Sequence, residues 1–154
     1  MILFRLAKAH LANDITGIGG LLAEGRWNRK GFRILYTSQS QALCFAELSV
    51  RLPISVAPSA YSIVHLEIPD QLVAGAFVPS ELPADWKSFP YAKSTLDLGT
   101  AFLIQAEHLV MRVPSAIVPD EFNFILNPAH PQFDLVVVRT IEPFPIDGRL
   151  YKRP

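Results

Sequence analysis

Glu47 is the side chain whose setting most clearly suggests chemistry. It lies in the segment 42–48, where every other residue is apolar and where Ser38 or Ser40 can cap a helix. On a helical wheel both faces of this segment are apolar, which is typical of a buried helix. A buried carboxylate needs a partner or a purpose. Two roles stay open for Glu47: an ion pair with Arg51, four residues on in the favourable acid-then-base order, or catalysis.

Two arginines are candidates for anion binding. Arg26 stands in Gly25-Arg26-Trp27-Asn28, and a guanidinium group can donate two parallel hydrogen bonds to a phosphate. Because four cations fall within residues 26–33, a solvated basic turn is the simpler interpretation of that segment. Arg5 is alone in the apolar strand predicted at 2–6, so it is the better candidate for a cation that points inward.

Tyr36 and Ser115 are weaker candidates when they are taken alone. Tyr36 lies in a predicted strand, where it can stack on a flat ring or simply pack in the core. Ser115 follows Val113-Pro114, with no Gly-x-Ser-x-Gly motif and no base beside it. The residue types therefore favour a hydrogen-bonding turn serine at 115 over a nucleophile.

Composition excludes several classes of function. Half of the 154 residues are hydrophobic, and 14 basic side chains balance 14 acidic ones. This predicts one compact domain over residues 1–154 with no bulk attraction to nucleic acid or to an anionic membrane. The four histidines lack ligand spacing, so no metal site is expected. The single cysteine, Cys44, and an N-terminus without signal-peptide features indicate a cytoplasmic protein.

Short elements alternate with proline-rich breaks. Helices are predicted from Ser40 to about Arg51, ended by Pro53 and Pro58, and from Ser94, which forms a capping box with Asp97. Strands are predicted at 2–6, 32–37, 61–68, 72–78, 109–113, 116–118, 122–126 and 135–141. The valine-rich strand 135–141 is expected to be central. The pattern is α+β, with many short strands, two main helices and no regular β-α-β alternation.

The order of the motifs resembles the RES-domain family, which supplies toxins of certain bacterial type II toxin–antitoxin modules. After the strand arginine come Gly-Arg-Trp-Asn, Ile-Leu-Tyr-Thr-Ser, Ala-Glu-Leu, Leu-Pro-Ala-Asp-Trp, Val-Pro-Ser-Ala and Asn-Pro-Ala-His-Pro. The resemblance runs from Arg5 to about Arg149. The arginine, glutamate and serine that give the family its name fall on Arg26, Glu47 and Ser115. Thr100 and Phe102 stand where members often have an acidic residue and a tryptophan, a departure expected to alter packing more than chemistry.

The resemblance implies a fold related to ADP-ribosyltransferase toxins and NAD as the substrate, with no metal. It also implies that Arg5 and Arg26 hold the diphosphate, that Tyr36 forms a wall for nicotinamide, and that Ser115 contacts the ribose or the carboxamide. The partner it implies is a helical DNA-binding antitoxin that covers the active site, in a complex that can also contain a homo-oligomer of the toxin.

Three functions follow from these observations. The first is cleavage of the nicotinamide–ribose bond with water or phosphate as acceptor, which drains cellular NAD. One carboxylate suffices for this reaction, because nicotinamide leaves as a neutral ring and needs no general acid. The second is transfer of ADP-ribose to a protein. The third is a non-catalytic binding domain in which a Glu47–Arg51 pair is structural.

Overall fold

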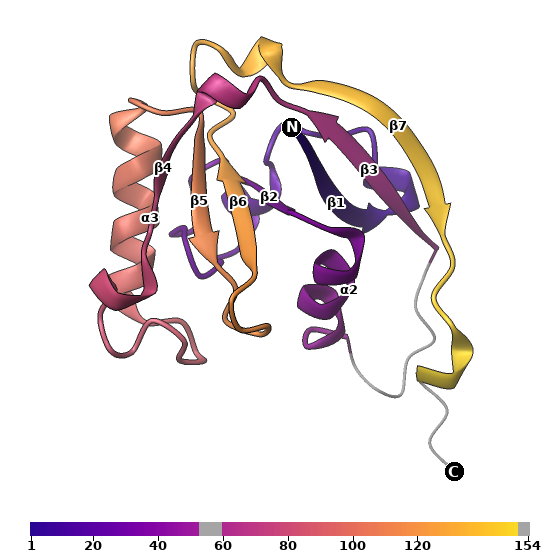
Figure 1. The fold of residues 1–154 in the computed structure, drawn as a ribbon, viewed down its shortest axis with the longest axis horizontal. Coiled ribbons are helices and arrows are strands. Elements are labelled where there is room, and N and C mark those ends of the chain that lie inside the picture. The colour runs from indigo at the N-terminus through magenta and orange to yellow at the C-terminus, as the bar shows by residue number, and fades with distance from the viewer. Residues whose placement is uncertain (53–59, 151–154) are drawn as a thin grey trace.

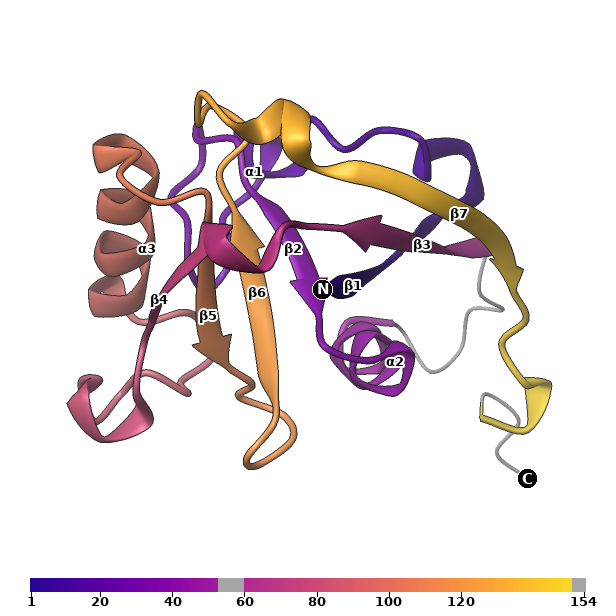
Figure 2. The same ribbon diagram turned by 45° about the horizontal axis from the view of Figure 1, so that its top comes forward.

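A seven-stranded sheet organises the chain. The computed structural model describes residues 1–52 and 60–150, so Pro53 and Pro58 lie outside the described residues. The strand order is β4-β5-β6-β2-β1-β3-β7, as Figures 1 and 2 show. The strands are β1 (Ile2–Lys8), β2 (Leu35–Ser38), β3 (Tyr61–Glu67), β4 (Val73–Ala76), β5 (Val110–Pro114), β6 (Phe122–Leu126) and β7 (Val137–Phe144). All neighbouring strands are antiparallel except β4 and β5.

The helices of the described residues are α1 (Gly19–Leu22), α2 (Gln41–Ser49) and α3 (Lys93–Gln105), with short 3-10 turns between other elements. Helix α3 lies beside the β4–β5–β6 part of the sheet, and α2 lies near the middle, below β1 (Figure 1). The predicted single-domain α+β fold with two main helices is therefore confirmed.

Two apolar clusters hold these layers together. One joins β1, β3, β5 and β6 through buried leucines and valines such as Leu3, Val64 and Leu126. The other packs α3 against the sheet and includes Trp27, Trp86 and Phe102. Both tryptophans are buried, as expected of packing residues. The second cluster attaches the turn 25–28 and the loop around Trp86 to α3.

Helix α2 begins directly after β2, which links Tyr36 to Glu47 through one short connection. Of the two predicted caps, Ser38 and Ser40, the N-cap is Ser40, whose Oγ accepts a hydrogen bond from the Leu43 N–H at 3.1 Å. The expectation of a buried helix is wrong, because only Leu43 and Cys44 of α2 are buried and Val50 is 61% exposed. Glu47 and Val50 line a cavity, so this part of the apolar segment stays accessible.

The expectation that the valine-rich strand is central is also wrong. Strand β7 is at the edge of the sheet and pairs with β3 alone among the described strands. Val138 and Ile141 pack against the core, whereas Val137 is 43% exposed. The strand is therefore only partly buried, and on one face, which a run of valines does not distinguish from burial on both faces.

Two local predictions fail for reasons that involve tertiary contacts. Helix α3 has Ala92 as its N-cap without a side-chain hydrogen bond, and the Ser94 hydroxyl instead donates to Asp85 in the preceding loop. Residues 116–118 form a bend rather than a strand, because the backbone N–H groups of Ile117 and Val118 donate to the Ser115 hydroxyl.

Candidate active site

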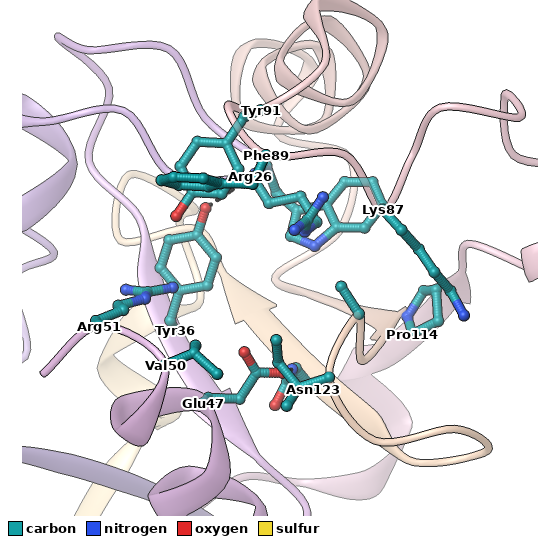
Figure 3. Close-up of a pocket in the computed structure, with 13 residues that line it drawn as sticks. Arg26, Tyr36, Glu47, Val50, Arg51, Lys87, Phe89, Tyr91, Pro114 and Asn123 are labelled. Atoms are coloured by element: carbon teal, nitrogen blue, oxygen red, sulfur yellow. Dashed lines mark hydrogen bonds between the residues drawn. The ribbon is translucent and has the colours of Figure 1, made fainter. Parts of the chain in front are cut away.

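A cavity of about 600 Å³ opens where β2, α2, the β5–β6 turn and the loop 86–91 meet. Figure 3 shows Glu47 and Asn123 on one wall, with Tyr36 and Arg26 across the opening from them. Its lining consists of Arg26, Trp27, Tyr36, Glu47, Val50, Arg51, Lys87, Phe89, Tyr91, Pro114, Ala116, Ile117 and Asn123. The cavity thus combines aromatic surfaces, three cations and a single carboxylate.

The Glu47 carboxylate is held by one of its oxygens. Oε1 accepts a hydrogen bond from the Ser115 hydroxyl at 2.8 Å and another from the Asn123 side-chain amide at 2.6 Å. Oε2 accepts no hydrogen bond from the described residues. Two donors on one oxygen fix the orientation of the group and leave the second oxygen for a ligand.

The structural alternative for Glu47 was an ion pair with Arg51. The described residues hold four ion pairs, at Asp70, Asp97, Glu67 and Asp147, and none joins Glu47 to Arg51. Arg51 nevertheless lines the same cavity. Its charge therefore faces the space that a ligand would fill.

Ser115 supports Glu47 from the end of β5. The side chain is only 4% exposed. Its hydroxyl donates to Glu47 and accepts the N–H groups of Ile117 and Val118 at 3.1 and 3.0 Å. One donor and two lone pairs are then all in use, so this hydroxyl has nothing left to offer another group in this conformation.

Arg26 lies between the cavity and the loop 86–91. Its Nη1 donates to the carbonyl oxygens of Trp86 and Ser88, and its guanidinium carbon is 5.3 Å from the centre of the Tyr91 ring. Burial lowers the pKa of Arg26, and the nearby Tyr91 and Glu47 oppose that shift. An arginine stays charged under such a change. Arg26 is thus a cation in the cavity wall as well as a clamp on the loop.

The basic turn serves two purposes. Only Arg26 of its cations lines the cavity, whereas Arg29 pairs with Asp97 of α3 at 2.5 Å and Arg33 donates to the Thr16 carbonyl. Lys30 is exposed. The interpretation as a solvated basic turn therefore applies to Lys30 and Arg33, which are both exposed, and not to Arg26.

Tyr36 presents its ring to the cavity while its hydroxyl is occupied. That hydroxyl accepts the Trp27 N–H at 3.0 Å and donates to the Asn28 side-chain oxygen at 2.8 Å. Burial raises the pKa of Tyr36 strongly, so the phenol stays protonated. The aromatic face can stack on a planar ring, and the hydroxyl fixes the turn that carries Arg26.

Close packing against α3 fixes the position of the turn 25–28. A Cβ on Gly99 would lie 1.9 Å from the Trp27 carbonyl oxygen, so the two backbones meet where only glycine fits. The next positions of α3 also contact the turn region, since Thr100 accepts the Arg29 N–H at 3.0 Å and Phe102 packs with Trp27. The departure from the family pattern at Thr100 and Phe102 thus falls on packing positions.

Arg5 is not part of the cavity wall. It lines an adjoining hollow of about 280 Å³ together with Asp14 and residues 17–20, and this hollow shares Tyr36 and Arg51 with the main cavity. Burial lowers the pKa of Arg5, and Asp14 opposes this. A third hollow of about 120 Å³ also shares Tyr36 and Arg51. Arg51 therefore lines all three of these spaces.

Sequence reasoning missed several residues of the cavity. Asn123 gave no signal, because an asparagine in a short strand has no motif around it. Lys87, Phe89 and Tyr91 fall in the proline-broken loop, where spacing predicts no orientation. Only the pairing of β2 with β6 and the Arg26 contacts to the loop place them at the site.

No group of three or more potential metal ligands occurs within residues 1–52 and 60–150. Over the same ranges, no helix combines the length and the apolar character that crossing a membrane requires.

Comparison with known proteins assigns this chain to a family. Residues 2–147 match the model of the RES domain. The chain belongs to the RES-domain family. One RES relative, the Prs ADP-ribosylating toxin of Sphingobium sp. (strain YBL2), is 32% identical over 149 residues, which cover 96% of this chain and 92% of that protein. Another, Toxin Res of Yersinia enterocolitica, is 34% identical over 153 residues, covering 97% and 99% respectively.

A solved structure supports the same assignment at the level of the fold. The chain resembles one in the crystal structure of the M. tuberculosis MbcT–MbcA toxin–antitoxin complex, with a TM-score of 0.76 over 97% of this chain and 86% of that chain. The identity is 18%, so this likeness concerns the RES-type fold alone. The family membership expected from the motif order is confirmed.

Proposed function

We propose that this RES-domain protein is a toxin that binds NAD and cleaves the bond between nicotinamide and ribose, with water or phosphate as acceptor. The observation that carries the proposal is the Glu47 carboxylate, fixed through Oε1 and presenting Oε2 in a cavity of about 600 Å³. Depletion of NAD would then arrest growth.

The proposed reaction needs charge stabilisation more than proton transfer. As the C1′–N bond breaks, its electron pair moves onto the pyridinium ring, and nicotinamide leaves neutral. Positive charge develops on the ribose, and Glu47 stabilises it directly or through the 2′-hydroxyl. An oxygen of water or phosphate then bonds to C1′, and a proton is released to solvent.

The other lining residues suit the remaining parts of NAD. Three cations, Arg26, Arg51 and Lys87, stand against the single carboxylate, which favours a diphosphate. The Tyr36 ring offers a flat wall for nicotinamide, and Arg5 in the adjoining hollow can hold the more distant phosphate. Ser115 acts through Glu47 in this proposal, because its hydroxyl is already bonded to that carboxylate.

The test is nicotinamide release from NAD by the purified protein, followed by chromatography with and without inorganic phosphate. A phosphorylated ADP-ribose product would identify phosphate as the acceptor, and free ADP-ribose would identify water. Folded protein that releases nicotinamide under neither condition would overturn the proposal.

A second candidate function is transfer of ADP-ribose to a protein. The relative from Sphingobium is named an ADP-ribosylating toxin, and this favours the candidate. Labelled NAD added to a bacterial lysate distinguishes the two functions. A discrete labelled protein band supports transfer, whereas nicotinamide release without a band supports NAD cleavage.

We also propose an antitoxin partner with a helical DNA-binding domain that covers the cavity, and a cytoplasmic site of action. Phe89, Val50 and Ile117 line the cavity and are 81%, 61% and 39% exposed, a set of apolar side chains suited to a covering segment. Co-expression with the neighbouring gene product should block nicotinamide release, and light scattering of the complex would give its stoichiometry and any homo-oligomer.

A further inference from the structure

The side-chain amide of Asn123 on β6 connects two polar groups. Its Nδ2 donates to Glu47 Oε1 at 2.6 Å, and its Oδ1 accepts the Ser38 hydroxyl at 2.6 Å. A flipped amide would place an oxygen against the carboxylate, so the chemistry of the two partners fixes which way the amide points. The result is a directed chain from the Ser38 hydroxyl through Asn123 to Glu47.

The pairing of strands in the sheet holds this chain of hydrogen bonds in place. Ser38 on β2 and Asn123 on β6 are register partners in the antiparallel ladder, and Asn123 is also opposite Val113 on β5. Ser115, the other donor to Glu47, follows β5 directly. The two donors that hold Oε1 therefore come from adjacent strands, while Glu47 itself comes from α2.

We propose that Asn123 is a positioning residue, which holds Glu47 so that Oε2 faces the ribose; this inference rests on the proposed function. Ser115 alone leaves the carboxylate free to turn about its Cγ–Cδ bond, because one hydrogen bond fixes one contact only. The second donor from Asn123, itself held by Ser38, removes that freedom. Pre-organised charge of this kind acts on the transition state more than on substrate binding.

Two substitutions separate positioning from packing. Asn123→Ala removes the donor and leaves space, whereas Asn123→Asp keeps the size and the acceptor for Ser38 but places a second carboxylate against Glu47. A packing role predicts that Asn123→Asp loses less activity than Asn123→Ala. Positioning predicts the reverse order, because a like charge displaces Glu47 or makes it share a proton.

The matched control is Gln39→Ala. Gln39, just after β2, also bonds to the start of β6 through its side chain, to Glu121 at 3.0 Å and to the Phe122 N–H at 3.3 Å. It is not one of the two described donors to Glu47. Nicotinamide release, growth arrest in a bacterial host and thermal unfolding are measured for all variants. We expect kcat to fall about tenfold in Asn123→Ala and about a hundredfold or more in Asn123→Asp, with KM for NAD within about threefold and the control unchanged.

The possible failures are distinct. Suppose the wild-type protein releases nicotinamide. If Asn123→Asp is then as active as wild type, or loses less activity than Asn123→Ala, the inference is overturned and the proposed function stands. If wild-type protein releases no nicotinamide, the proposed function fails, and the order of growth arrest among the variants still decides whether Asn123 acts through Glu47. A rise in KM with unchanged kcat would assign Asn123 to substrate binding and reject a positioning role.

Discussion

At the scale of single residues, the charge of Glu47 can be separated from its hydrogen bonds. Glu47→Gln keeps the Oε1 acceptor for Ser115 and Asn123, so the fold should persist, with a melting temperature within a few degrees of wild type. Removing the charge should lower nicotinamide release by about a hundredfold or more and relieve growth arrest. Glu142→Gln, on an exposed position of β7, is the control.

A different result would favour the non-catalytic interpretation. If Glu47→Gln lowered the melting temperature while growth arrest stayed at the wild-type level, the carboxylate would be structural. Nicotinamide release and unfolding must therefore be measured on the same preparation.

The hydroxyl of Tyr36 contributes to stability, whereas its ring belongs to the cavity. Tyr36→Phe leaves the Trp27 N–H and the Asn28 side-chain oxygen without this partner, which should cost about 1–3 kcal/mol of unfolding free energy. Affinity for ADP-ribose, measured by calorimetry, should stay within a few-fold because the ring remains. Tyr91→Phe is a control for stability only, since the Tyr91 hydroxyl makes no hydrogen bond within the described ranges but its side chain lines the cavity. A loss of affinity with unchanged stability would contradict this division.

Sequence reasoning could reach some of these residues and not others. Arg26, Tyr36 and Glu47 can be proposed from the sequence because their motifs lie within one segment, and the structure brings all three to one cavity. Ser115 can be proposed from family order, but its contact with Glu47 depends on how β5 ends. Asn123 depends on strand register across 85 positions of sequence, from Ser38, and local patterns do not encode that pairing.

At the scale of elements, the packing of the turn 25–28 on α3 should control the position of Arg26. Gly99→Ala would place a methyl group 1.9 Å from the Trp27 carbonyl oxygen, and either α3 or the turn must move. We expect a loss of about 3 kcal/mol in unfolding free energy and weaker NAD cleavage in the protein that remains folded. Urea unfolding and nicotinamide release measure the two effects.

Gly148→Ala is the control for this substitution. A Cβ at Gly148 meets no atom within 4 Å, and this glycine lies in a short 3-10 turn that lines none of the three cavities, so alanine should be neutral there. Equal effects of the two substitutions would show that the contact between Gly99 and Trp27 does not matter.

The sequence predicts well those elements whose signals are local. Periodicity and capping residues are local, so β1, β3, β6 and the Ser40 cap agree with the structure. Position in the sheet is not local: β7 carries valines on both faces but ends at an edge. The capping box predicted for the N-terminus of α3 does not form, because Ser94 bonds to Asp85 in the preceding loop.

At the scale of the whole molecule, net charge and local charge lead to opposite expectations for anion binding. The chain is formally neutral, yet three cations and one carboxylate line the main cavity, and Arg51 also lines both adjoining hollows. Arg51→Ala and Lys30→Ala change the net charge equally, and Lys30 is exposed in the turn away from the cavity lining. If the local geometry of the cavity governs binding, only Arg51→Ala should weaken ADP-ribose binding. We expect Arg51→Ala to weaken ADP-ribose binding about tenfold, or about 1.4 kcal/mol, in calorimetry at physiological salt. Equal weakening in both variants would assign binding to net charge and remove Arg51 from the site.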